Sequence, residues 1–345
     1  MTHEFKNLIQ AYLNAKHIGL KTVMATVVAL DGSSYRRPGV RMLINEQGHM
    51  TGAVSGGCVE KEILRQADSV FNTGKPKMMT YDGRYRLGCE GVLYILIECF
   101  DPDSEMNSAF EICLADRTNF EIHTFYTKKT GIDGNWGSEI CFSNNKQFPL
   151  AKNNNSLRIK SSLSELFSQV MEPCFKLIII GAEHDTAQLC LMSSSLGWEV
   201  DIVISPSNPQ TLKDFPGAHQ LIYKSPEDLI LDKVNNRVAI VLMTHSYAKD
   251  LQYLIALKDS KPAYMGLLGP SNRRERMLND LIERFPAIDD AIFDFIYGPA
   301  GLNIGAETPQ EIALSICSEI LSVIRDQKPK SLKDKLGSIH LNINI

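Results

Sequence analysis

The 345-residue sequence predicts an α/β protein, in which an N-terminal α+β domain precedes a C-terminal domain built on a doubly wound parallel sheet. First, the chain is too long for one typical hydrophobic core, so two or three domains are expected. Second, apolar strand-like runs alternate regularly with helix-like runs from residue 174 to residue 326, as buried parallel sheets require. Third, residues 1–103 carry strands and Gly-rich loops without that alternation.

The N-terminal region is predicted to begin with a helix. The segment MTHEFKNLIQAYLNAK is polar and amphipathic, unlike a signal peptide. Two β-branched or apolar runs, KTVMATVVAL (21–30) and GVLYILIECF (91–100), are typical of buried strands. We expect residues 1–103 to form the first domain.

Residues 104–172 are expected to be a middle segment or linker. The run FEIHTFYT favours a strand. The Asn-rich stretch 143–160 favours a loop or hairpin end, and the run SSLSELFSQVM favours a short capped helix. The second domain is predicted to span 173–328, followed by a tail over 329–345.

The second domain is predicted from its alternating elements. Strands are expected at FKLIIIGA, EVDIVIS, RVAIVLMTH and AYMGLLG, and helices at 184–196, YAKDLQYLIALKD and SNRRERMLNDLIERF. The last helix has an explicit start, because Thr308 can cap it, Pro309 fits its first turn and Glu311 follows three residues on.

Composition excludes several classes of protein. The net charge is −4, with no basic run, so a nucleic-acid partner is not expected. No run of 18 apolar residues predicts a membrane span, and a cytoplasmic location is the expectation. The eight cysteines form no C-x-x-C pair, which argues against a disulfide framework.

The most informative short stretch is AVSGGCVEKEIL, residues 53–64, in which Ser55, Gly56, Gly57 and Cys58 stand at a predicted helix start. A thiol there meets the positive end of the helix dipole and unpaired backbone amides, which favour the thiolate. Glycines let a ligand approach closely. Cys89, in LGCEG, repeats the pattern. Zinc binding by Cys58 and Cys89 is a weaker alternative, because zinc sites usually hold ligands in close pairs.

Three arginines stand beside small residues upstream of this stretch. Arg36, Arg37 and Arg41 follow GSS in a turn-to-strand segment. Guanidinium groups bind phosphate bidentately. The alternatives are an anion-binding cluster or a solvated turn with one buried ion pair.

The second domain opens with an incomplete dinucleotide fingerprint. In LIIIGAEHDTAQL, Gly181 fits the first glycine of G-x-G-x-x-G, which makes the domain Rossmann-like. Glu183 stands at the second glycine, where a carboxylate would repel a pyrophosphate. Ser205 follows the next strand, where an acidic residue would hold a ribose. We therefore do not expect NAD(P) to bind in the usual way.

Polar groups follow two strands of the predicted sheet. His184 follows the first strand, and His245 follows RVAIVLM. Open α/β sheets bind ligands at this edge, although a lone histidine is more often structural. We expect both histidines to face the Cys58 loop in one cleft, since cofactor sites favour domain interfaces.

Seven motifs occur in an order that resembles the XdhC/CoxI family of xanthine dehydrogenase accessory proteins. They are GSSYRRPGVRML, GAVSGGCVE, LGCEG, IIIGAEHD, MTHSYAKDL, MGLLGPSNRRERM and GLNIGAETPQEIALSICSEI. The resemblance covers residues 10–100 and 174–326. It implies a maturation factor, rather than an enzyme, that transiently holds the molybdenum cofactor (molybdopterin), protects it during sulfuration and passes it to a molybdenum hydroxylase apoenzyme.

The resemblance also implies roles for particular residues. Cys58 and Cys89 match the family's cysteines that are thought to contact the cofactor. The expected contact is between their thiols and the metal of the cofactor. A cysteine desulfurase is a second expected partner, and a homodimer the expected assembly. Glu183, Ser205 and Ser246 depart from residues common in relatives. The alternatives are an oxidoreductase that uses NAD(P) or a metallocofactor and, less favoured, a cysteine-based sulfur transferase.

Overall fold

The chain forms two compact units, Met1–Pro173 and Cys174–Ile345. The computed structural model describes residues 1–32, 37–85, 91–152 and 164–335. The expected boundary near residue 103 does not separate compact units, because 104–173 belongs to the first unit. No helix in these described ranges is both long and apolar enough to cross a lipid bilayer.

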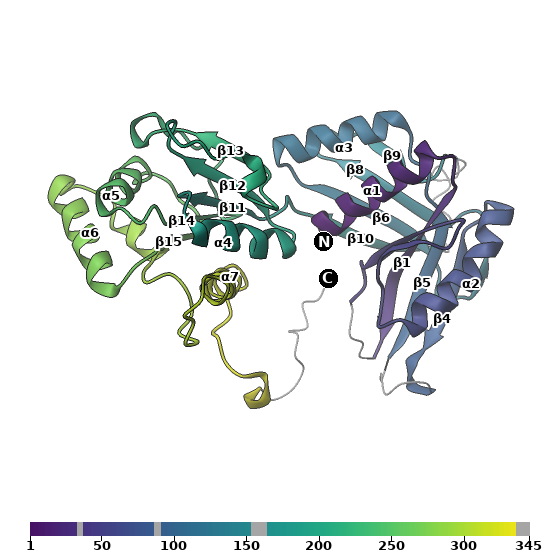
Figure 1. Cartoon of the computed structure of the whole chain (residues 1–345). Helices are drawn as coiled ribbons and strands as arrows, with labels where there is room; N and C mark the ends of the chain where they lie inside the picture. Colours follow the sequence, from purple (N-terminus) through teal and green to yellow (C-terminus); the bar gives the residue numbers. More distant parts are fainter. Residues whose placement is uncertain (33–36, 86–90, 153–163, 336–345) are drawn as a thin grey trace. The chain divides into compact units, whose positions relative to one another are not determined.

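The first unit contains two antiparallel sheets with the strand orders β3-β2-β1-β5-β4-β7 and β10-β6-β8-β9. Figure 1 shows β1, β4 and β5 of the first sheet and the strands of the second. Its elements are α1 (Thr2–His17), β1 (Thr22–Asp31), β2 (Arg41–Asn45), β3 (Met50–Gly52), α2 (Cys58–Thr73), β4 (Lys77–Asp82), a short 3-10 turn (Gly83–Tyr85), β5 (Val92–Cys99), α3 (Ser104–Asp116), β6 (Phe120–Tyr126), β7 (Gly131–Ile132), β8 (Gly137–Phe142), β9 (Gln147–Pro149) and β10 (Glu165–Met171).

The first sheet is buried on both faces. Val23 and Ala25 of β1 pack with α2, whereas Met24 packs with α1, α3 and the second sheet. This follows from the period of two along a strand, and it explains why eight consecutive β1 residues are buried. The predicted N-terminal helix and the strands at 21–30 and 91–100 are confirmed.

The segment between residues 104 and 172 builds the second sheet rather than a linker. The strand predicted at FEIHTFYT is confirmed as β6, but the helix predicted at SSLSELFSQVM is wrong. Residues 165–171 of that segment form β10, which pairs with β6 from Glu165 to Met171. The apolar spacing suits a helix, but pairing with a neighbouring strand overrides local propensity.

The second unit is an all-parallel sheet with the order β13-β12-β11-β14-β15-β16. Its elements are β11 (Lys176–Ile180), α4 (His184–Ser195), β12 (Glu199–Ile204), β13 (Gln220–Tyr223), β14 (Val238–Leu242), α5 (Tyr247–Ala256), β15 (Tyr264–Leu267), α6 (Ser271–Arg284), β16 (Ile296–Tyr297) and α7 (Pro309–Ile324). This is the doubly wound order of dinucleotide-binding folds, so the predicted fold class is confirmed.

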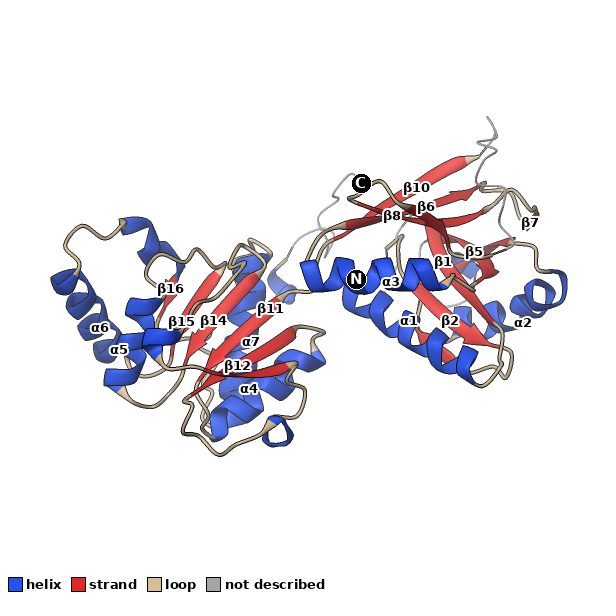
Figure 2. Cartoon of the chain, turned by 90° about the horizontal axis from the view of Figure 1, so that it is seen from above, coloured by secondary structure: helices blue, strands red, loops and turns tan. Residues whose placement is uncertain are grey.

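Helices cover both faces of the parallel sheet (Figure 2). Apolar residues of α4 and α7 pack with one face, and those of α5 and α6 with the other. The predicted start of α7 is confirmed, since Thr308 Oγ1 accepts a hydrogen bond from Glu311 N. The short strands β13 and β16 were not predicted from the sequence.

Candidate functional site

The SGGC loop, residues 55–58, joins β3 to α2 in the first unit. Cys58 is the first residue of α2 and is exposed. Gly57 has a φ of 109°, a conformation that side chains rarely adopt. A Cβ on Gly56 or Gly57 would meet nothing within 4 Å. The outer side of the loop is therefore open space next to an exposed thiol.

A buried carboxylate that the sequence reasoning missed holds this loop from beneath. Glu60 accepts hydrogen bonds from the backbone N–H groups of Val54, Ser55 and Gly57, at 3.0, 2.6 and 2.6 Å. Its side chain is buried in the first turn of α2. A Glu three residues after a helix cap is the available signal, because that carboxylate reaches back to the cap's N–H.

The Glu60 contacts change how the loop can bind an anion. The amide of Ser55 donates to Glu60, so that it is already satisfied within the protein. A carboxylate at a helix N-terminus also offsets the positive end of the helix dipole. The loop is therefore better suited to present the Cys58 thiol to a ligand than to enclose a phosphate with its amides.

The predicted arginine cluster is not one surface group. Arg41 is 7% exposed and donates through Nη1 to Gly39 O at 2.9 Å and to the side chain of Gln169. It alternates with Met42, which faces α2, and so points towards the second sheet. Of the two alternatives for these arginines, Arg41 therefore fits a buried position rather than an accessible anion-binding cluster. Arg37 lies half-buried before β2, and Arg36 lies outside the described residues.

Arg41 has an acidic neighbour in the interior of the first unit. Glu98 of β5 is fully buried and accepts hydrogen bonds from Ser138 N and Oγ at 2.8 and 2.5 Å. Burial raises the pKa of Glu98 to about 7, against the opposing effects of Ser138 and Arg41. Burial lowers the pKa of Arg41 to about 10. These groups join the two sheets and are structural.

Cys89 lies outside the described residues. Its convergence with Cys58, as cofactor or metal ligands, remains a prediction. Four of the remaining cysteines divide by burial: Cys190 and Cys317 are buried, whereas Cys99 and Cys174 are half-buried. Burial raises the pKa of Cys190 to about 12 and that of Cys317 to about 11, which keeps both as inert thiols.

Gly181 lies where the strand order of the second unit reverses, between β11 and β14. A Cβ there would come within 2.5 Å of Met243 O, and its φ is 145°. The glycine therefore has a structural reason, close approach of two strand ends. Ligands of open α/β sheets bind at this reversal point.

The predicted strand-end histidines lie at this same edge. His184 is the first residue of α4, and His245 has a φ of 56° just after β14. His245 Nε2 is 3.2 Å from Asp185 Oδ2, which brings the end of β14 to the start of α4. Whether this edge faces the Cys58 loop remains a prediction.

A buried polar network that the sequence reasoning did not identify supports the edge. Asp250 is 2% exposed and accepts hydrogen bonds from Thr244 N and Oγ1 at 3.1 and 2.6 Å. Arg273 pairs with its other oxygen. This network fixes the turn that carries His245, so Asp250 and Arg273 are positioning residues.

The nucleotide subsites are as incomplete in the structure as in the sequence. Glu183 is exposed and forms the N-cap position of α4. Ser205 follows β12 and shares a hydrogen bond of 3.0 Å with Ser207.

A cavity of about 760 Å³ lies in the first unit, lined by Lys16, Lys75 and Lys152 among others. It reaches the C-terminal end of α2, a full helix length from Cys58.

Two family models match the chain. The one described as the XdhC Rossmann domain matches residues 177–320, and the one described as the XdhC and CoxI family matches residues 17–82. Six of the seven motifs above fall within these two ranges, whereas LGCEG, at residues 87–91, lies outside both.

Relatives that match over most of their length agree with these family models. The chain is 28% identical to a protein of Bacillus subtilis described as a probable component of xanthine dehydrogenase, over 92% of this chain and 96% of that one. It is 22% identical to the molybdenum cofactor insertion chaperone PaoD of Escherichia coli, over 96% and 92%. A crystal structure of a xanthine dehydrogenase from Bacillus halodurans superimposes with a TM-score of 0.73, at 25% identity, covering 93% of this chain and 96% of that one.

Proposed function

Because the chain belongs to the XdhC and CoxI family, we propose that it binds the molybdenum cofactor and delivers it to the apoenzyme of a xanthine dehydrogenase-type molybdenum hydroxylase. The observation that carries the proposal is similarity to a molybdenum cofactor insertion chaperone over nearly the whole of both chains. The proposed role is that of a maturation factor rather than of a turnover enzyme.

The SGGC loop fits such a ligand. Cys58 is exposed, and the space over Gly56 and Gly57 is open. Thiolate suits a metal such as molybdenum, or a sulfur-exchange intermediate. When bound, the cofactor would supply the metal and its sulfur chemistry, whereas the chain would supply a thiol on a loop that Glu60 holds in shape.

Three finer features belong to the same proposal. Cys89 is the expected second thiol contact. A cysteine desulfurase would supply sulfur while the cofactor is held, and two copies of the chain would act together as a homodimer. Each feature can be tested separately, because a single chain can bind the cofactor without the Cys89 contact, the desulfurase or a second copy.

The test is purification from a host that makes the molybdenum cofactor, followed by molybdenum and pterin analysis of the protein. We expect both in similar molar amounts in the wild type and a sharp loss of both in Cys58→Ala. A Cys190→Ala variant is the matched control, because Cys190 is buried in the second unit. Absence of molybdenum and pterin from the wild type would contradict the proposal.

One observation favours a second candidate, an oxidoreductase that uses NAD(P). The strand order of the second unit is that of dinucleotide-binding domains. Glu183 and Ser205 weaken this alternative, because they stand at the pyrophosphate and ribose positions. Titration with NADH distinguishes the two candidates.

A further inference from the structure

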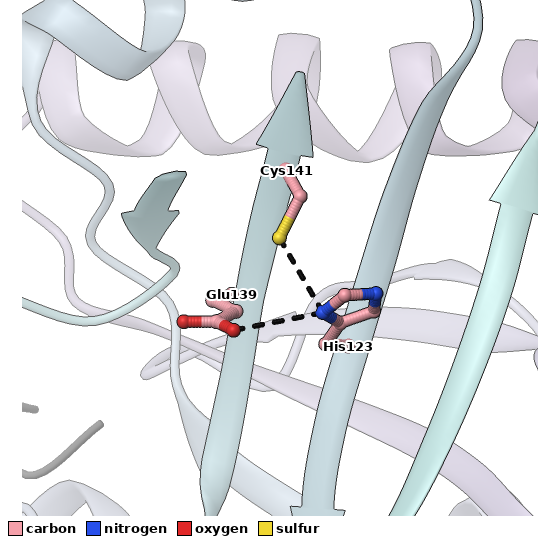
Figure 3. A group of neighbouring side chains, drawn as sticks. All are labelled: His123, Glu139 and Cys141. Atoms are coloured by element: carbon pink, nitrogen blue, oxygen red, sulfur yellow. Dashed lines mark hydrogen bonds and ion pairs between the residues drawn. The ribbon is translucent and has the colours of Figure 1, made fainter. Parts of the chain in front are cut away.

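Four side chains capable of metal chemistry lie on one face of the second sheet. His123 of β6 stands directly opposite Glu139 of β8, and Glu121 stands opposite Cys141. Because alternate residues of a strand share a face, all four project away from Ile122 and the apolar core on the other face. Figure 3 shows His123, Glu139 and Cys141 converging from the two strands.

The distances suit a single metal ion. His123 Nδ1 is 3.5 Å from Cys141 Sγ and 3.6 Å from Glu139 Oε1. One ligand atom from each of the three residues lies within 4.8 Å of the others. In a tetrahedral zinc site, with bonds of about 2.0–2.3 Å, ligand atoms lie roughly 3.3–3.8 Å apart. Small side-chain rotations would therefore complete the geometry.

The second nitrogen of His123 is already held. Nε2 lies 2.8 Å from Glu121 Oε2, whereas Nδ1 lies on the side of the ring that meets Cys141 and Glu139. A carboxylate on the far nitrogen is the usual partner of a metal-binding histidine.

The environment is half-buried rather than closed. The side chains of His123 and Glu139 are 22% and 13% exposed, respectively. An ion can thus enter from solvent, while partial burial strengthens its attraction to the carboxylate. Three protein ligands leave one tetrahedral position for water or another small ligand.

A second cluster in the chain shows what a satisfied arrangement looks like. Glu199, Asp201 and His219 also gather ligand atoms, but Lys176 Nζ lies 2.8 Å from Glu199 and 2.6 Å from Asp201. The lysine occupies the space between the two carboxylates and offsets one of their two negative charges. Among the described residues, no lysine or arginine pairs with Glu139.

We propose that His123, Glu139 and Cys141 bind one divalent transition-metal ion of the zinc class, and that Glu121 orients His123. Imidazole and thiolate select such an ion over magnesium or calcium, which prefer oxygen ligands. Binding converts the Cys141 thiol to thiolate and releases its proton to solvent. The site is independent of the cofactor proposed for the SGGC loop.

The test uses the full chain, stripped of metal with a chelator and then dialysed. Zn²⁺ affinity is measured by competition with a chromophoric chelator, and Co²⁺ serves as a spectroscopic probe. We expect about one ion per chain and a thiolate-to-cobalt charge-transfer band that Cys141→Ser removes. Glu139→Gln and His123→Asn should lower Zn²⁺ affinity at least about 100-fold, and Glu121→Gln about 10- to 100-fold with the band retained.

Matched controls separate this site from the other candidates. Cys58→Ser, His219→Asn and Cys113→Ser should keep wild-type Zn²⁺ affinity and the cobalt band. Cys113 is the buried cysteine of α3 and is not one of the proposed ligands. Circular dichroism checks that each variant folds, and Glu121→Gln is the safest probe because Glu121 is 47% exposed. No metal uptake by the wild type, or unchanged affinity in both Cys141→Ser and Glu121→Gln, would overturn the proposal.

Discussion

Glu60 Oε2 accepts a hydrogen bond from the backbone N–H of Gly57 at 2.6 Å, immediately beside the exposed Cys58. The other Glu60 oxygen accepts from Val54 and Ser55. One buried carboxylate thus determines the shape of the loop that presents the thiol. The predictions for the first unit begin from this relationship.

Glu60→Ala should destabilise the first unit by about 2–4 kcal/mol, because three backbone N–H groups lose a charged acceptor. Glu62→Ala is the control, since Glu62 lies two residues on and pairs with the exposed Arg65 at 2.6 Å. An exposed pair contributes about 1 kcal/mol or less. Urea denaturation measures both changes, and equal losses would contradict a special role for Glu60.

Cys58→Ala should change the free energy of unfolding by no more than about 1 kcal/mol, because an exposed side chain has little packing to lose. Cys190→Ala should cost about 1–2 kcal/mol in the second unit, because it leaves a cavity. Cofactor retention should show the opposite pattern: Cys58→Ala should lose the cofactor, whereas Cys190→Ala should keep it. Among the described cysteines, Cys58 should also alkylate first, as the exposed one; faster labelling of Cys190 would argue against this assignment.

Gly56→Ala and Gly57→Ala separate ligand access from backbone strain. Gly57 has a φ of 109°, so its substitution should destabilise the first unit by about 1–2 kcal/mol. Gly56 carries no such restraint and has open space around it, so Gly56→Ala should leave stability almost unchanged. Loss of bound molybdenum in Gly56→Ala alone, measured per folded chain, would show that the glycine admits the ligand. Full retention would show that it does not.

The stability of the first unit should fall as the pH rises from about 4.5 to about 7. Burial raises the pKa of Glu98 to about 7, whereas the unfolded chain keeps a value near 4.5. The folded state therefore binds more protons in this window, and the loss levels off above the folded pKa. Glu98→Gln should reduce this pH-dependent loss in the free energy of unfolding by roughly 1–3 kcal/mol. Urea midpoints of the wild type and of Glu98→Gln at pH 5, 6, 7 and 8 measure this pH dependence of stability. The same dependence in both proteins would exclude Glu98 as the cause.

NADH should bind more weakly than about 1 mM, that is, with less than about 4 kcal/mol of binding free energy. The physical reasons are the Glu183 carboxylate at the close-approach position and Ser205 at the ribose position. Fluorescence of Trp198 next to β12 provides the readout. The double variant Glu183→Gly, Ser205→Asp should bind at least about tenfold tighter, and micromolar binding by the wild type would refute the prediction.

Much of the candidate site is accessible from local sequence. The glycines and the following amphipathic run predict Cys58 at a helix start, and the structure places it there. For Arg41 the sequence left two alternatives open, an anion-binding cluster and a turn with one buried ion pair, and its burial excludes an accessible position. Strand alternation instead turns it towards the second sheet, beside Gln169, a residue distant in sequence. No local pattern reports which face of a strand a neighbouring sheet will cover.

The sequence by itself determined the parallel sheet of the second unit, the start of α7 and the position of Cys58, because these depend on short-range periodicity and capping. Only the tertiary structure decided that residues 165–171 form a strand, since its hydrogen bonds go to β6. The same holds for His123 and Cys141, which meet because strands β6 and β8 pair in one particular register. Contacts of this kind depend on which distant segments pair, and local propensity carries no information about that choice.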